Sequence, residues 1–175
     1  MSGALGLWLR RGVVAAMLAV PACAGQPQPA DNAYCAMLFD QFDAFVFTPQ
    51  AWGLTYDFRQ MQLARIRQAR CITFTANLAN MDAVAKSLAG HRPPAGMALQ
   101  APVAVAAGVV TNPSDEARAL AFFEAAGYRA RSVGWEYLGT RVYVQALTLP
   151  QIDDIVGMAQ RAGFVGPYPS RWVTF

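Results

Sequence analysis

The chain has 175 residues, of which 55% are hydrophobic and 14% charged, and its formal net charge is +3. Removal of an N-terminal segment that carries Arg10 and Arg11 leaves twelve basic and eleven acidic side chains, a net charge of +1. Nucleic acid is therefore a poor candidate partner, because contact with several phosphates needs clustered cations. The densest basic stretch, at residues 59–70, is interpreted as the solvated face of one helix.

The first 24 residues have the three parts of a secretory signal. A basic pair precedes an apolar run from Val13 to Val20, and small residues follow at positions 22–24. The apolar run is too short to span a bilayer. We therefore expect export to the periplasm, with residues 25–31 as a polar tether.

Two cleavages of this signal are open. Ala22-Cys23-Ala24 fits the small-x-small pattern of ordinary signal peptidase, which gives a signal peptide of residues 1–24. Residues 20–23 also form a degenerate lipobox, with Cys23 as the lipidated residue. The mature protein is thus expected to be either soluble or a membrane-anchored lipoprotein.

The cysteine count supports export. Apart from Cys23, the chain contains only Cys35 and Cys71, an even pair that is expected to bond in an oxidising compartment. A metal site is not expected, because the single histidine, His91, lies in a proline-bearing segment and two sulfurs do not complete a tetrahedral site.

Residues 32–90 are predicted to be helical. The spacing of Cys35, Leu38, Phe42 and Phe45 places them on one stripe of a first helix. A second helix, ending near Cys71, is expected to run back beside it, and a third, short helix to end at Gly90. The aromatic side chains of this region exceed what one stripe can bury, so some should pack on the part of the chain that follows. They are Phe39, Phe42, Phe45, Phe47, Trp52 and Tyr56.

Residues 91–102 contain several prolines and no consistent period, and are predicted to be a linker. Residues 103–175 carry the clearest pattern. An apolar strand, 103–110, precedes a helix with Asn112 as N-cap and Pro113 at its first position. Two strands, a second helix from Pro150 and a final strand in 168–175 follow.

An internal repeat organises this part of the chain. Both predicted helices end in Ala-Gly-aromatic, at Gly127-Tyr128 and Gly163-Phe164. Two such halves predict a ferredoxin-like βαββαβ sandwich, with a four-stranded antiparallel sheet, both helices on one face and the other face open. The fold class of the whole chain is thus α+β, a helical hairpin region stapled by a disulfide and followed by this sandwich.

A hairpin tip at Leu138-Gly139 would place Trp135 opposite Val142 and Glu136 opposite Arg141. In that register the open face carries a tyrosine, a guanidinium and an amide, which suit stacking on a sugar ring and bonding to its hydroxyl groups. A solvated face without a ligand is an equal alternative. The candidate ligand-binding residues are Ser132, Gly134, Arg141, Tyr143 and Gln145.

Catalysis is not expected, and neither is a cofactor. No serine, cysteine or lysine has a plausible base beside it in the predicted layout. The acid pairs Asp40 with Asp43 and Asp153 with Asp154 are interpreted as helix-surface charges, since no apolar surroundings are expected that would separate their pKa values.

The last two-fifths of the chain resembles the SPOR (sporulation-related repeat) family. The similarity rests on the repeated Gly-aromatic helix ends and on Arg141-Val142-Tyr143-Val144, which is similar to the third strand of that family. The resemblance implies an exported, ferredoxin-like module that binds peptidoglycan glycan strands lacking stem peptides. The sequence departs from the family in the first strand, at 106–110, and after the third, at Gln145-Ala146-Leu147.

Three functions follow as hypotheses, the last of which is an unrecognised hydrolase that a deep pocket containing an acid of raised pKa would favour. In the first, a non-enzymatic envelope protein holds peptidoglycan glycan on its sheet. In the second, the sheet or the aromatic-rich hairpin docks another envelope protein, and sugar binding has been lost. A large exposed apolar patch on the hairpin would favour the second.

Overall fold

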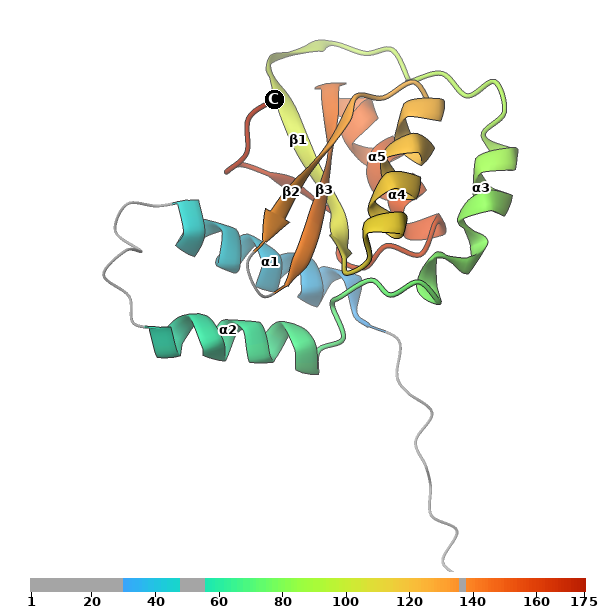
Figure 1. Cartoon of the computed structure of the whole chain (residues 1–175). Helices are drawn as coiled ribbons and strands as arrows, with labels where there is room; N and C mark the ends of the chain where they lie inside the picture. The colour runs from blue at the N-terminus through green and yellow to red at the C-terminus, as the bar shows by residue number, and fades with distance from the viewer. Residues whose placement is uncertain (1–29, 48–55, 136–137) are drawn as a thin grey trace, which may run out of the picture.

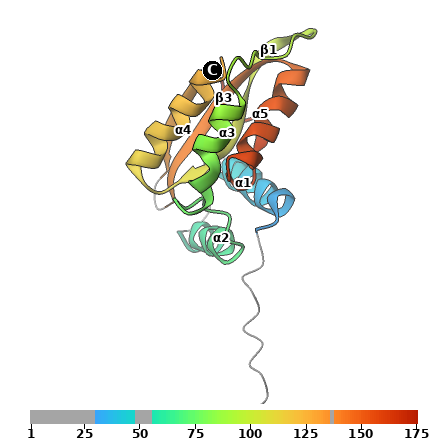
Figure 2. The same ribbon diagram turned by 90° about the vertical axis from the view of Figure 1, so that its right-hand side faces the viewer.

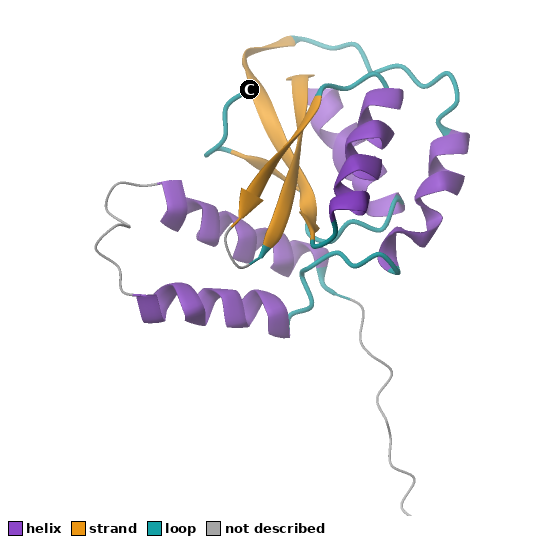
Figure 3. Ribbon diagram, in the orientation of Figure 1, coloured by secondary structure: helices purple, strands orange, loops and turns teal. Residues whose placement is uncertain are grey.

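The computed structural model describes residues 30–47, 56–135 and 138–175. Within them the protein is α+β, with a four-stranded antiparallel sheet and five α-helices (Figures 1 and 3). In chain order the elements are α1 (Asn32–Phe47), α2 (Tyr56–Gln68), the 3₁₀-helix η2 (Asn77–Asn80), α3 (Met81–Ser87), β1 (Ala98–Val110), α4 (Pro113–Ala125), β2 (Ala130–Trp135), β3 (Gly139–Thr148), α5 (Leu149–Arg161) and β4 (Tyr168–Ser170). The predicted order of helices and strands is confirmed.

The sheet has the strand order β2-β3-β1-β4, and α4 and α5 cover one of its faces. Between the sheet and these helices lies a first core, which includes Val105, Phe123, Val144 and Ile155. α3 packs on the outer side of α4 and α5 and faces the viewer in Figure 2. This face of the sheet is therefore covered by two layers of helices.

Local signals set the ends of the α4 and α5 helices. The side chain of Asn112 accepts a hydrogen bond from the backbone N–H of Ser114, and Pro113 occupies the first turn, as predicted. Gly127 and Gly163 have φ of +85° and +91°, the left-handed conformation in which glycine ends a helix without steric cost. The aromatic residue after each glycine is buried in the first core.

Two boundaries differ from the prediction. β1 begins at Ala98, inside the segment predicted to be a linker, because Ala98 pairs with Thr148 of β3. The register shifts between Ala98 and Val103, and this irregularity accommodates Pro102 in the strand. The final strand is shorter than predicted, since only Tyr168–Ser170 pair with β1.

The second face of the sheet is not open, so that prediction is wrong. α1 lies against it, and α2 packs on the outside of α1 (Figure 1). Phe39 and Phe42 of α1 share a second core with Ala104 and Ala106 of β1 and with Tyr143 of β3. Aromatic side chains of the helical region pack on the sheet, as their number predicted.

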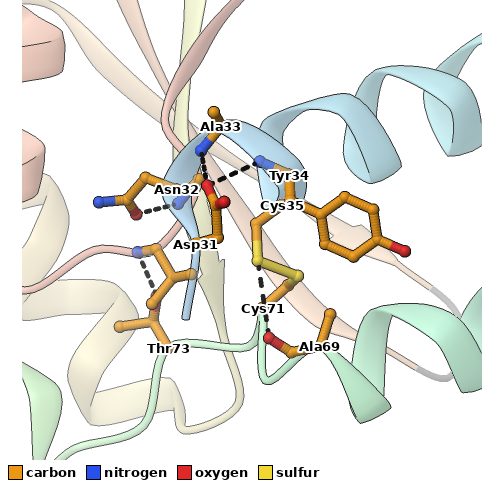
Figure 4. The surroundings of a disulfide bond; sticks show 10 residues. Asp31, Asn32, Ala33, Tyr34, Cys35, Ala69, Cys71 and Thr73 are labelled. Carbon is orange, nitrogen blue, oxygen red and sulfur yellow. Dashed lines mark hydrogen bonds between the residues drawn. A yellow bond between two sulfur atoms is a disulfide. The ribbon is translucent and has the colours of Figure 1, made fainter. Parts of the chain in front are cut away.

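A disulfide joins the start of α1 to the segment after α2, between Cys35 and Cys71 (Figure 4). Its Cα–Cα distance is 5.3 Å and both cysteines are fully buried. The predicted pairing is confirmed, and such a bond is typical of an oxidising compartment outside the cytosol. In the described part of the chain no helix is long and apolar enough to cross a membrane.

Candidate functional site

The pairing of β2 with β3 differs from the predicted register. Trp135 lies opposite Gly139, and Val133 lies opposite Arg141. The shift relative to the prediction is an odd number of residues, so every side chain of β2 changes face. Trp135 consequently belongs to the second core, beneath α1, and not to the core beneath α4 and α5. Glu136, the predicted partner of Arg141, lies outside the described residues.

The five predicted ligand residues do not share one face. Arg141 and Tyr143 project toward α1, and Gln145, two residues further along β3, lies on the same side and is half-buried. Ser132 points to the opposite side, where its hydroxyl donates to Oε1 of Glu116 on α4, and Gly134 lies on that side by strand alternation. The structure thus brings together Arg141 and Tyr143, but inside the protein, where neither has any exposed surface.

Arg141 is the centre of a buried polar group that joins α1 to the sheet. Its Nη1 donates to Oδ1 of Asp43 on α1 at 2.7 Å, and its Nη2 donates to the hydroxyl of Tyr168 on β4 at 2.8 Å. The Tyr168 hydroxyl in turn donates to Oδ2 of Asp43. The three side chains form a closed ring of hydrogen bonds from which water is excluded, which we call the Arg141 centre.

Aromatic rings surround the guanidinium. Its central carbon lies 4.6 Å from the ring centroid of Phe39, 5.0 Å from Trp135, 5.3 Å from Tyr168 and 5.8 Å from Tyr143. The negative faces of these rings offset part of the cost of burying a cation. Arg141 is therefore held by α1, β2, β3 and β4 together, and it acts as a fixed internal charge.

Burial shifts the pKa values of this centre. It raises the pKa of Asp43 to about 6, although the attraction of Arg141 and the hydrogen bond from Tyr168 act to lower it. Burial acts to lower the pKa of Arg141, but the neighbouring Tyr168 and Asp43 outweigh it, so that pKa is raised and the guanidinium stays charged. Burial also raises the pKa of Tyr143 to about 12. Asp43 is therefore the group of the centre that titrates in the mildly acidic range.

The prediction that Asp40 and Asp43 are both surface charges is wrong for Asp43. The signal that sequence reasoning missed is its position beside Phe39 and Phe42 on the apolar stripe of α1. An acid on a buried stripe requires a buried cation, and an arginine within an apolar strand is the natural partner.

In and beside the Arg141 centre, three buried polar atoms make no hydrogen bond of ordinary geometry within the described chain. They are Nε of Arg141, Nε1 of Trp135 and the hydroxyl oxygen of Tyr143. The Trp135 side chain nevertheless interacts with the Tyr143 hydroxyl and acts to lower the pKa of Tyr143, against the larger effect of burial. Because the Arg141 centre is closed to solvent, it offers no surface on which a sugar could stack.

The C-terminal segment, residues 171–175, closes the rest of this face. Arg171 and Nε1 of Trp172 both donate to the carboxylate of Asp40 on α1, each at 3.0 Å. Val173 is buried in the second core. The guanidinium of Arg131 on β2 stacks on the ring of Phe175 at 4.9 Å and donates to the carbonyl of Thr174. The last residues therefore connect α1 to the strand at the far edge of the sheet.

Asp154, one member of the other predicted acid pair, lies in contact with His91. Oδ2 of Asp154 on α5 lies 2.8 Å from Nε2 of His91 and accepts a hydrogen bond of 2.6 Å from the hydroxyl of Tyr128. These contacts attach the segment before β1 to α5. Within the described ranges no three metal-ligating side chains come together. Cys23, the candidate lipidation site, lies outside the described residues.

Comparison of the chain with models of protein families, with curated proteins and with solved structures finds no match.

Proposed function

We propose that the protein is an exported, non-enzymatic envelope protein that binds another envelope protein, and that its sheet has lost the ability to hold glycan. The signal-like N-terminal sequence and the Cys35–Cys71 disulfide support export to the periplasm. The strand order β2-β3-β1-β4, with α4 and α5 on one face, supports a ferredoxin-like, SPOR-like origin of the sheet.

One observation carries this proposal: two of the residues expected to contact glycan, Arg141 and Tyr143, are buried beneath α1. Neither has exposed surface, and the two terminal nitrogens of Arg141 bond to Asp43 and Tyr168. A glycan strand could reach them only if α1 and the C-terminal segment left the sheet. That step would expose the apolar side chains of the second core to water, which costs several kcal/mol.

The end of the sheet beyond α1 offers a surface for a protein partner. The side chain of Met97 is 82% exposed, and those of Leu147 and Leu149 are 51% and 56% exposed. Ala98 pairs with Thr148, so Met97, Leu147 and Leu149, which adjoin this pair in sequence, lie at the same end of the sheet. From Pro93 to Ser114 the sequence contains no charged residue. This end thus carries exposed apolar side chains of the kind that mark a binding site.

The adjoining edge of β1 can accept a further strand. β4 pairs only with Ala104–Ala106, and in the described part of the chain no strand pairs with Ala98–Val103 on that side. Exposed backbone groups beside apolar side chains are the requirement for recognition by strand addition. We infer that the partner contributes an extended, apolar segment to this edge.

Two experiments test the proposal. Purified protein of residues 24–175 is sedimented with peptidoglycan sacculi before and after an amidase removes the stem peptides, and it should stay in the supernatant in both cases. In cells, a photocrosslinking amino acid at Met97 or Leu149 should give one discrete adduct, which the same group at exposed Glu124 of α4 should not give. Sedimentation with denuded sacculi would instead support glycan binding. Equal crosslinking at all three positions would contradict the partner surface.

A further inference from the structure

We propose that the end of the α1–α2 hairpin at the disulfide docks on an anionic phospholipid surface. This surface, which we call the disulfide end, lies away from the apolar end of the sheet and goes beyond the proposed protein partner. Its residues are Tyr34, Met37, Arg65, Arg70 and Phe74.

The disulfide brings these residues to one place. The bond brings Cys35 and Cys71 together (Figure 4), and Tyr34 and Arg70 are the residues that immediately precede these two cysteines. Sγ of Cys35 also lies 3.9 Å from the carbonyl oxygen of Ala69, a second contact between the start of α1 and the segment after α2. Figure 4 shows the ring of Tyr34 projecting from the start of α1 beside the disulfide.

Large apolar side chains are exposed at this end. Tyr34 and Met37 are each 45% exposed, and Phe74, just after the disulfide, is 51% exposed. Single exposed apolar residues are ordinary on protein surfaces. Aromatic and apolar side chains interleaved with arginines, however, match the chemistry of the boundary between lipid head groups and acyl chains.

The charge of the disulfide end complements an anionic surface. Arg65 and Arg70 lie five residues apart in sequence, and both are exposed. The acid at this end is Asp31, whose carboxylate accepts the backbone N–H groups of Ala33 and Tyr34. The disulfide end therefore carries an excess of positive charge although the whole chain is nearly neutral.

The other acids of the hairpin do not cancel this charge. Asp43 is buried in the Arg141 centre, and the carboxylate of Asp40 is paired with the guanidinium of Arg171. Asp57 lies in the first turn of α2, at the far end of that helix from Arg70. Cations near an anionic membrane each strengthen binding, and the attraction falls off within a Debye length.

The path of the chain before α1 agrees with a membrane at the disulfide end. α1 begins at Asn32, so the preceding residues join the folded part at the disulfide end (Figure 1). The seven residues between Cys23 and Asp31 can span at most about 25 Å. A lipid on Cys23 would hold this end against the bilayer, and the apolar end of the sheet would then face away from it.

Vesicle flotation tests the inference with protein of residues 24–175, which lacks the lipid-acceptor cysteine and contains every described residue. The wild type should float with phosphatidylcholine vesicles that contain phosphatidylglycerol, and not with phosphatidylcholine alone, and high salt should release it. The variant Arg65→Gln, Arg70→Asn should bind roughly tenfold to thirtyfold more weakly. Asparagine is chosen at position 70 because Arg70 has a left-handed φ of 58°.

A second double variant controls for the loss of two positive charges elsewhere on the protein. Arg92→Gln with Arg129→Gln removes two exposed arginines near the end of α4, far from the disulfide, and should bind like the wild type. Failure of the wild type to float with anionic vesicles, or equal weakening by the two double variants, would overturn the inference. Photocrosslinking at Met97 is unaffected by either outcome, so the two proposals fail separately.

Discussion

Asp43 on α1 and Arg141 on β3, 98 residues apart in sequence, form an ion pair of 2.7 Å in which neither side chain is exposed. This pair, with Tyr168, converts the face that sequence reasoning assigned to a ligand into an internal interface. The stability of the helical region on the sheet should therefore depend on both partners.

Removal of one partner alone should be costly. Asp43→Ala or Arg141→Ala leaves a buried group without its counterpart, and the free energy of unfolding should fall by about 3 to 5 kcal/mol. Urea unfolding followed by circular dichroism measures this loss. The double variant Asp43→Leu, Arg141→Met should recover most of it, because apolar side chains replace both charges.

The exposed pair of Arg171 with Asp40 is the matched control. Arg171 is largely exposed, and Arg171→Ala should change the free energy of unfolding by at most about 1 kcal/mol. Equal decreases in the free energy of unfolding for Arg141→Ala and Arg171→Ala would show that the buried ion pair contributes no more to stability than the exposed one.

Stability should also depend on pH through Asp43. Its pKa is raised to about 6 in the folded protein from a usual value near 3.8, so the folded state holds a proton that the unfolded state has released. The stabilisation from this group is complete below about pH 4 and is lost as pH rises through 6, by roughly 3 kcal/mol for the whole shift. Urea unfolding of the wild type at a series of pH values, minus that of Asp43→Asn, isolates this contribution. A difference that grows with rising pH would contradict the assignment.

The disulfide should stabilise the fold through its loop of 36 residues. Cys35→Ser with Cys71→Ser should lower the free energy of unfolding by about 3 to 4 kcal/mol, because the unfolded chain gains freedom. Thermal unfolding of the oxidised protein, the reduced protein and the variant provides the measurement. Equal melting temperatures with and without reductant would mean that the bond does not constrain the unfolded chain.

Two glycines should respond in opposite directions. Gly163 has φ of +91°, and an added Cβ would lie 1.7 Å from the carbonyl oxygen of Asn77, so Gly163→Ala should destabilise by more than about 2 kcal/mol. Gly157, inside α5, has nothing within 4 Å of the added atom, and Gly157→Ala should stabilise by about 0.5 to 1 kcal/mol. Chemical denaturation measures the free energy of unfolding of both variants. A loss of stability in Gly157→Ala would contradict the prediction that this position in α5 has room for a methyl group.

Local patterns were sufficient to predict most of the elements. Asn112 and Pro113 mark the start of α4, and Gly127 and Gly163 mark helix ends, because these residues act through their own backbone geometry. The disulfide also followed from the cysteine count alone. In each case the signal and its cause lie within a few residues or in one pair.

The pairing register of β2 with β3, and the covering of the second face of the sheet by α1, could not be predicted from local patterns. Trp135 fits beneath α1 because Phe42 meets its ring at 5.0 Å, a contact between segments that are 93 residues apart. A tight turn at Leu138-Gly139 was locally reasonable, but burial of Trp135 against Phe42 decides the pairing instead. The position of Asp43 among phenylalanines was the one local sign that a buried cation had to come from elsewhere.

The Arg141 centre also has a consequence for how the chain matures. Synthesis proceeds from the N-terminus, so the apolar stripe of α1 is made long before Arg141 and Tyr168, and the clamp on Asp40 comes from the last five residues. Until then, α1 has no sheet on which to settle, and it is exposed to aggregation and to proteases.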